Sequence, residues 1–111
     1  MKLSEVTRLL AAARECNTLE GYIGECGGSL PDDSYYEDDG ASKAVEVLTV
    51  LYECRDGISI NTLLRLYGGS VADFYREYGI PRRTMQNWLT ETNNHSDPPQ
   101  YLMRLILADL I

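Results

Sequence analysis

The chain has few of the residues on which most enzyme active sites and metal sites depend. Its 111 residues include a single histidine, His95, and three cysteines, Cys16, Cys26 and Cys54, which form no CxxC pair and have no histidine close by in the sequence. An odd number of cysteines without such spacing predicts neither a disulfide framework nor a zinc site. The sequence also contains no serine-elbow motif and no phosphate-binding glycine loop. We therefore expect no enzyme activity, no metal site and no cofactor.

The chain also lacks a long apolar run. No stretch approaches the roughly 18 uninterrupted apolar residues of a membrane-spanning helix. Glu5 and Glu15 interrupt the first fifteen residues, where a signal peptide would need an apolar run. The length fits one domain with a real hydrophobic core. We therefore expect a single domain over residues 1–111, located in the cytoplasm and not associated with a membrane.

Positive charge is scarce and unevenly distributed. The chain has 10 Lys and Arg residues against 17 Asp and Glu residues, which gives a net charge of −7. Residues 1–59 contain five of the basic and twelve of the acidic residues, whereas residues 60–111 contain five of each. All of the net negative charge therefore lies in an acidic N-terminal half. Because cations supply most of the non-specific affinity for DNA, one copy of such a chain should bind nucleic acid weakly.

Apolar residues recur at helical spacing along most of the chain, and no long alternating segment predicts a strand. The pattern predicts an all-α domain of five to six helices, with Ser4, Ser42 and Ser70 as N-caps. Gly21 and Gly24 leave the segment 19–26 short or irregular. In the final helix, the expected inner face consists of Tyr101, Leu102, Leu105 and Ile106.

Residues 27–42 differ in composition from the rest of the chain. They combine Gly, Pro and Ser with five acidic residues, which is typical of a solvated loop, so we expect a mobile or loosely packed segment. Alignment with a calcium-binding loop on Gly40 places Tyr35 where the first carboxylate is needed. No calcium site is therefore predicted in this segment.

The most informative stretch is Phe74–Trp88, which reads as two short helices joined by a turn. Gly79 lies where the turn needs a positive φ. The residues that would face inward at such a turn are Phe74, Tyr78, Ile80, Met85 and Trp88. The residues left facing outward are Arg82, Arg83, Thr84, Gln86 and Asn87. Their side chains are of the types that contact base edges and phosphates, so the pattern predicts double-stranded DNA as the partner.

These motifs resemble a known family. The matching residues are Gly79-Ile80-Pro81, Arg83-Thr84, Gln86-Asn87-Trp88, Pro98-Pro99, Tyr101 and Arg104-Leu105-Ile106. Over about residues 60–108 the chain looks like the C-terminal part of a Cro/repressor-type, or xenobiotic-response-element-type, helix-turn-helix domain. The resemblance implies an all-α fold, DNA recognition by the helix that begins near Pro81, and homodimers on palindromic sites. Members of this family are often repressors, antitoxins or regulators of phages and mobile elements.

Two interpretations of the whole chain remain. In the first, residues 60–111 form the helix-turn-helix half of a sequence-specific transcriptional regulator, and residues 1–59 support dimerisation or repel non-specific DNA. In the second, the chain is an acidic inhibitor of a nucleic-acid-binding host protein, such as a phage-encoded anti-CRISPR-like protein whose carboxylates imitate a DNA backbone. Its expected partner-binding residues are Asp32, Asp33, Tyr35, Tyr36, Glu37, Asp38 and Asp39. The charge around Arg82 distinguishes the two interpretations.

Overall fold

A computed structural model of the chain describes residues 1–37, 42–90 and 98–111. These residues contain seven α-helices and one short 3-10 helix and no strand, which confirms the all-α prediction but exceeds the expected five to six helices. The chain divides into two compact units, unit 1 (residues 1–57 with Ile111) and unit 2 (residues 58–110). This division lies within two residues of the predicted boundary between the acidic and the neutral half. A single domain over the whole chain stays a prediction.

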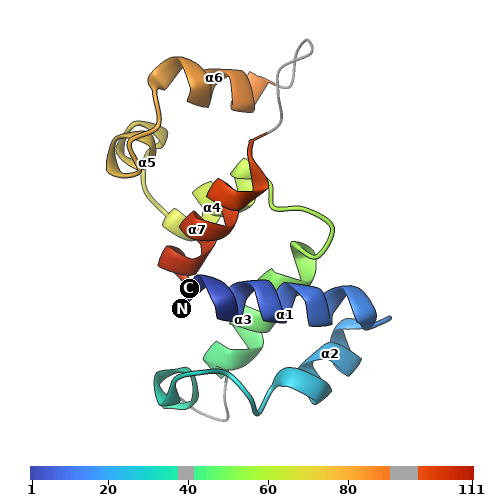
Figure 1. The fold of residues 1–111 in the computed structure, drawn as a ribbon. Helices are drawn as coiled ribbons and strands as arrows, with labels where there is room; N and C mark the ends of the chain where they lie inside the picture. Colours follow the sequence, from blue (N-terminus) through green and yellow to red (C-terminus); the bar gives the residue numbers. More distant parts are fainter. Residues whose placement is uncertain (38–41, 91–97) are drawn as a thin grey trace. The chain divides into compact units, whose positions relative to one another are not determined.

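Unit 1 is built around its last helix. Its elements are α1 (Leu3–Glu15), α2 (Leu19–Cys26), η1 (Asp33–Tyr36) and α3 (Ser42–Glu53). Helix α3 packs against α1, α2 and η1 (Figure 1). The side chains of Val6, Leu9 and Ala13 on α1 and of Leu48 and Leu51 on α3 are fully buried. Their spacing of three and four residues is the stripe that the sequence pattern predicts for a helix with one inner face.

The start of α1 differs from the prediction, whereas α2 is short, as predicted. Ser4 does not cap α1, because the helix already begins at Leu3 and Lys2 takes the N-cap position without a side-chain hydrogen bond. Helix α2 has eight residues and is α-helical throughout, although it contains two glycines. The Thr18 hydroxyl caps α2 by accepting a hydrogen bond from the Gly21 N–H at 3.0 Å, and Tyr22 is fully buried. A side-chain cap and one large buried residue thus offset the helix propensity lost at the glycines.

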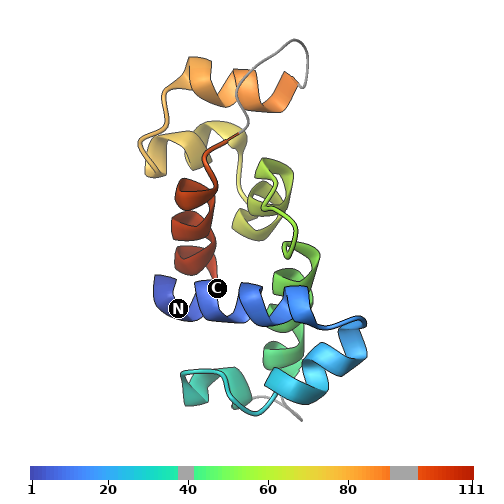
Figure 2. The ribbon, with the colours of Figure 1, turned by 45° about the vertical axis from the view of Figure 1, so that its right-hand side comes forward.

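Unit 2 is also organised around one helix. Its helices are α4 (Ile60–Tyr67), α5 (Val71–Glu77), α6 (Arg82–Thr90) and α7 (Gln100–Leu110). Helix α4 packs against the other three, and α5 packs against α6. Figure 2 shows α4 and α7 side by side. The Ser59 and Ser70 hydroxyls cap α4 and α5, and Gly68 ends α4 with a φ of 75°. The core of this unit includes Leu63, Phe74, Ile80, Met85, Met103, Ile106 and Leu107.

The predicted inner face of the last helix is confirmed for Ile106 and wrong for Tyr101 and Leu105, and Leu102 is half-buried. Tyr101 and Leu105 are 60% and 39% exposed, whereas Met103, Ile106 and Leu107 are buried. Residues 101–107 are apolar at every position except Arg104, so their pattern does not determine which side faces inward. Packing of α7 against α4 selects the row of residues spaced by three and four from Met103. Within the described residues, no helix is both long enough and apolar enough to span a bilayer.

Candidate nucleic-acid interface

The turn between α5 and α6 is fixed by a Schellman motif. Gly79 adopts a φ of 67°, in the left-handed region where a side chain would be strained. The Gly79 N–H donates to the Arg76 carbonyl at 3.3 Å, and the Ile80 N–H donates to the Tyr75 carbonyl at 2.8 Å. These are the two hydrogen bonds that define this helix end. Ile80 is also buried, so the turn that precedes α6 is held by backbone hydrogen bonds and by the core.

We expect Gly79→Ala to lower the free energy of unfolding by about 1 kcal/mol, because alanine resists positive φ. No atom lies within 4 Å of the added Cβ, so the cost is conformational and not steric. Gly24→Ala is the matched control, since Gly24 lies within α2 and its added Cβ also meets nothing within 4 Å. It should stabilise the protein by roughly 0.5–1 kcal/mol. Chemical denaturation of both variants tests the contrast, and equal effects would contradict the role assigned to Gly79.

Helix α6 presents most of the predicted DNA-binding residues on one face. Arg82, Arg83 and Gln86 are exposed and Asn87 is half-buried. Their spacing of one and four residues places them on an arc of about 140° in a helix with 3.6 residues per turn. Met85, on the opposite side, is 1% exposed and belongs to the core. The buried side of α6 therefore fixes which of its polar side chains face solvent.

Three residues of α6 lie differently from what the sequence pattern indicates. Thr84 is half-buried. It lies one residue, or about 100° of helix rotation, beyond Arg83, which places it outside the arc of the other four residues and on the side of Trp88. Thr90 is exposed and belongs to the polar arc, although it is not among the predicted DNA-binding residues. Its position four residues after Gln86 is the signal that would have found it. Trp88 is half-buried and not fully in the core.

The polar face of α6 has the charge and the hydrogen-bond donors to attract an anion. Its sequence, RRTMQNWLT, contains two arginines and no acidic residue. Within the described part of the chain, the side chains of Arg82, Arg83 and Gln86 make no hydrogen bond or ion pair. Pro81, which precedes the helix, has no side-chain acceptor to cap the first N–H groups. Two cations beside these N–H groups interact unfavourably with the positive end of the helix dipole. A bound anion would be attracted by the N–H groups and by the arginines, and would so offset this repulsion.

Two of the acidic residues in unit 2 interact with tyrosine hydroxyls. The Tyr78 hydroxyl donates a 2.6 Å hydrogen bond to Asp109 Oδ2. A hydrogen bond to the Glu77 carboxylate is the main cause that raises the pKa of Tyr67 to about 12, and desolvation adds to it. Among the described ion pairs, none joins an acidic residue to Arg82 or Arg83. Cations, not acids, therefore determine the charge of α6.

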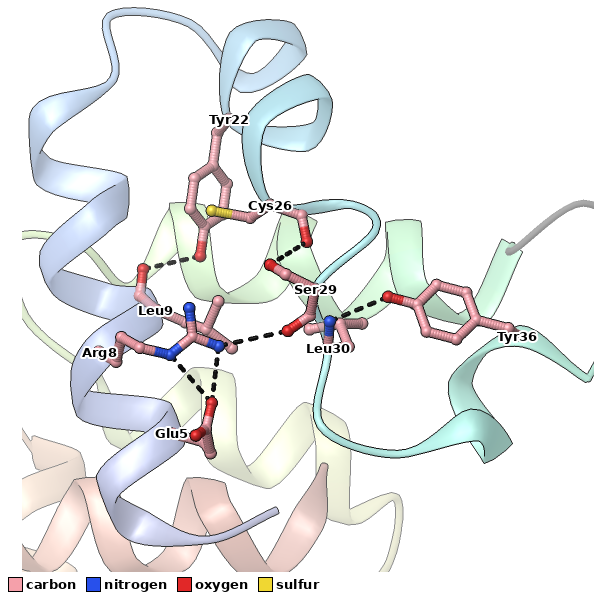
Figure 3. A network of polar contacts seen from close by, with 8 residues as sticks. All are labelled: Glu5, Arg8, Leu9, Tyr22, Cys26, Ser29, Leu30 and Tyr36. Atoms are coloured by element: carbon pink, nitrogen blue, oxygen red, sulfur yellow. Dashed lines mark hydrogen bonds and ion pairs between the residues drawn. The ribbon is translucent and has the colours of Figure 1, made fainter.

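The acidic segment of unit 1 makes hydrogen bonds over residues 27–37, and Leu30 and Tyr35 are buried there, whereas its mobility stays a prediction. The Tyr36 hydroxyl accepts a hydrogen bond from the Leu30 N–H and donates one to the Gly27 carbonyl, both at 2.9 Å. Arg8, which also pairs with Glu5, donates to the Ser29 carbonyl at 3.3 Å (Figure 3). The Tyr36 hydroxyl thus joins the end of the segment 27–37 to its beginning. The Arg8 contact joins the segment to α1.

The predicted partner-binding residues in this segment have different environments. Tyr35 is 5% exposed, so its ring belongs to the core and cannot form a contact surface. Asp32 accepts a 2.9 Å hydrogen bond from the Ser34 N–H, and this backbone contact is the main cause that lowers the pKa of Asp32. Asp33 and Glu37 are exposed and Tyr36 is half-buried. Asp38 and Asp39 lie outside the described residues, as does His95.

No metal centre is seen in the part of the chain that the structure describes, because no three His, Cys, Asp or Glu side chains are placed to hold an ion there. Cys26 and Cys54 are buried, and the Cys16 thiol donates to Glu25 Oε2 at 3.2 Å. Comparison of the chain with known protein families, characterised proteins and solved structures gives no match.

Proposed function

We propose that the protein is a sequence-specific DNA-binding regulator of the helix-turn-helix type, and that α6 is its recognition helix. The observation that carries this proposal is the polar face of α6. Its two arginines, Gln86 and Asn87 face one direction, without acidic neighbours on the helix. Arg reads guanine, and Gln or Asn reads adenine, through paired hydrogen bonds in the major groove.

The way in which α6 is packed into unit 2 also supports this function. A reading helix must be held rigidly while its polar face remains free. The buried Met85 and Ile80 anchor α6 and the turn before it, and the Gly79 turn fixes where the helix begins. The exposed side chains of Arg82, Arg83 and Gln86 are then available for a partner.

We further propose that two copies act together on a palindromic site. Residues 60–111 contain as many acidic as basic residues, so the electrostatic affinity of one copy for phosphates is small. Two copies double the number of phosphate and base contacts, and two-fold symmetry matches a palindrome. The acidic residues of unit 1 would repel non-specific DNA and so increase selectivity.

One observation favours a second function, the acidic inhibitor. The whole net charge of −7 is carried by residues 1–59, as a protein that imitates nucleic acid would require. The structure weakens this candidate at its expected contact segment. Tyr35 is buried there, and the Asp32 carboxylate caps η1. Asp33 and Glu37 remain as exposed acidic side chains without an assigned role.

Neutralising the acidic segment separates the two functions. The variant carries Asn or Gln in place of Asp32, Asp33, Glu37, Asp38 and Asp39; asparagine at position 32 retains an oxygen that can cap η1. For a regulator we expect stronger non-specific DNA binding at low salt, because five repulsive charges are removed. The gain should fade as the Debye length falls from about 30 Å to about 8 Å. Titration of fluorescent DNA at two ionic strengths measures this.

A matched control neutralises five exposed acids elsewhere in unit 1, namely Glu15, Glu20, Glu25, Glu46 and Asp56. A regulator should gain a similar amount of DNA binding from either set, because the effect depends on total charge. An inhibitor should instead lose its protein target only when the segment 32–39 is neutralised. Absence of DNA binding by all three proteins at low salt would exclude the regulator.

A further inference from the structure

Helix α7 is hydrogen-bonded near both of its ends to the segments that flank α4 and α5. At its start, the Gln100 amide exchanges two hydrogen bonds with the Ile58 backbone, at 2.8 and 3.1 Å, next to the beginning of α4. Near its end, Asp109 accepts the 2.6 Å hydrogen bond from Tyr78. Between these points α7 packs along α4. The second attachment therefore joins α7 to the chain between α5 and α6.

Tyr78 lies at the junction between α5 and the turn before α6. It is the C-cap residue of α5 and the first residue of the turn that leads into α6. Its ring packs against Phe74 and Tyr67, with centroid distances of 5.1 and 6.3 Å. The ring thus holds Tyr78 within unit 2, and the hydroxyl directs the hydrogen bond to α7. A donor bonded to a carboxylate forms a stronger hydrogen bond than a neutral pair does.

We propose that Tyr78 and Asp109 are a positioning pair that fixes the orientation of the α5–α6 turn, and with it α6, relative to α7. This inference rests on the proposed function, because orientation matters only if α6 reads DNA. Without the pair, the turn keeps its own hydrogen bonds and its buried Ile80 but loses its hydrogen bond to α7. The turn and α6 could then shift together against α7, and only a fraction of the molecules would present α6 correctly. The apparent dissociation constant rises in inverse proportion to that fraction.

The test uses Tyr78→Phe, Asp109→Ala and the double variant of the full chain. Tyr78→Phe keeps the ring packing and removes only the hydroxyl, so the fold should persist. We expect each single change to raise the dissociation constant for the duplex selected by the wild type about fivefold, at the lower end of typical coupling between sites. The double variant should be no weaker than the weaker single variant, because both changes remove the same hydrogen bond.

Trp88 provides a second readout that does not involve DNA. It is the single tryptophan of the chain and lies half-buried on α6, so its fluorescence emission reports the surroundings of that helix. We expect the emission to shift in Tyr78→Phe and Asp109→Ala at unchanged helicity. Asp109→Asn, which keeps an acceptor oxygen, should restore most of the wild-type emission. Tyr101→Phe is the control, since it removes an exposed hydroxyl from α7 itself.

The outcomes separate the positioning pair from the proposed function. Wild-type affinity and wild-type emission in both single variants, or additive losses in the double variant, would overturn the positioning role. A purely structural role would lower the melting temperature without changing the dissociation constant measured well below it. If the emission shifts as expected but the wild type selects no DNA, the pair is supported and the proposed function fails.

Discussion

Replacing Arg83 and Gln86 together by alanine should abolish the preference of the protein for the duplex that the wild type selects. Both side chains are exposed on α6. Each good bidentate contact to a base discriminates by about 1–3 kcal/mol, so the loss of two such contacts removes most of the selectivity. The melting temperature should change little, because exposed side chains away from caps contribute within about 0.5 kcal/mol to stability. Competition titrations with selected and scrambled duplexes measure the effect.

Arg76→Ala is the matched control for this experiment. It removes one exposed arginine from the neighbouring helix α5, at 5.9 Å from the ring of Tyr75, and leaves α6 unchanged. It removes one positive charge but no proposed base contact, so any loss of binding should be similar for all sequences. Wild-type selectivity in the Arg83→Ala, Gln86→Ala variant would exclude α6 as the reading helix.

Phe74→Ala should lower the free energy of unfolding by about 3–5 kcal/mol, the usual cost of truncating a buried aromatic residue. Phe74 is fully buried, and its ring contacts Tyr67 edge-on at 5.3 Å and Tyr78 at 5.1 Å. Alanine leaves a cavity beneath the turn before α6 and removes both ring contacts, which are worth about 0.5–1.5 kcal/mol each beyond their buried area. Denaturant unfolding followed by Trp88 fluorescence reports the loss from α6 itself.

Val71→Ala on the same helix provides the comparison. Val71 is 40% exposed, so its truncation should have a much smaller effect than that of Phe74. Equal losses in the two variants would show that Phe74 is not the anchor of the α5–α6 pair.

The α5–α6 region was the part of the fold most readily predicted from the sequence. Helix α6 begins at Arg82, next to Pro81 where the resemblance places its start, and Gly79 has the positive φ that its place between two apolar stripes predicts. Phe74, Ile80 and Met85 are buried as their spacing predicts. Local signals are strong here because a glycine and a proline mark the turn and each short helix has one apolar side.

Other features depend on contacts between residues far apart in the sequence. The buried side of α7 is set by α4, because nearly every position of that helix is apolar and its own pattern selects no face. The composition of residues 27–42 predicts a solvated loop. In the structure, Leu30 and Tyr35 from this segment are buried against the rest of unit 1. Thr84 is polar by type yet lies on the flank of α6, because Met85 fixes the rotation of the helix.

The hydrogen bond between Tyr78 and Asp109 could not be predicted from the sequence either. The two residues are 31 positions apart, and Tyr78 reads in the sequence as an ordinary inward-facing aromatic residue. Its hydroxyl becomes informative only when α7 is placed beside it. A half-buried tyrosine usually finds a partner for its hydroxyl, but the sequence does not identify which acceptor will be within reach.

Whether α6 reads DNA can be decided by selecting duplexes from a random DNA library with the 111-residue protein at low ionic strength and sequencing them. We expect an enriched site with two symmetric half-sites about one helical turn apart. The enriched bases should disappear when Arg83 and Gln86 are replaced by alanine. Recovery of unselected sequences from the wild type, or an enriched site that is unchanged in that variant, would contradict the assignment of α6 as a recognition helix.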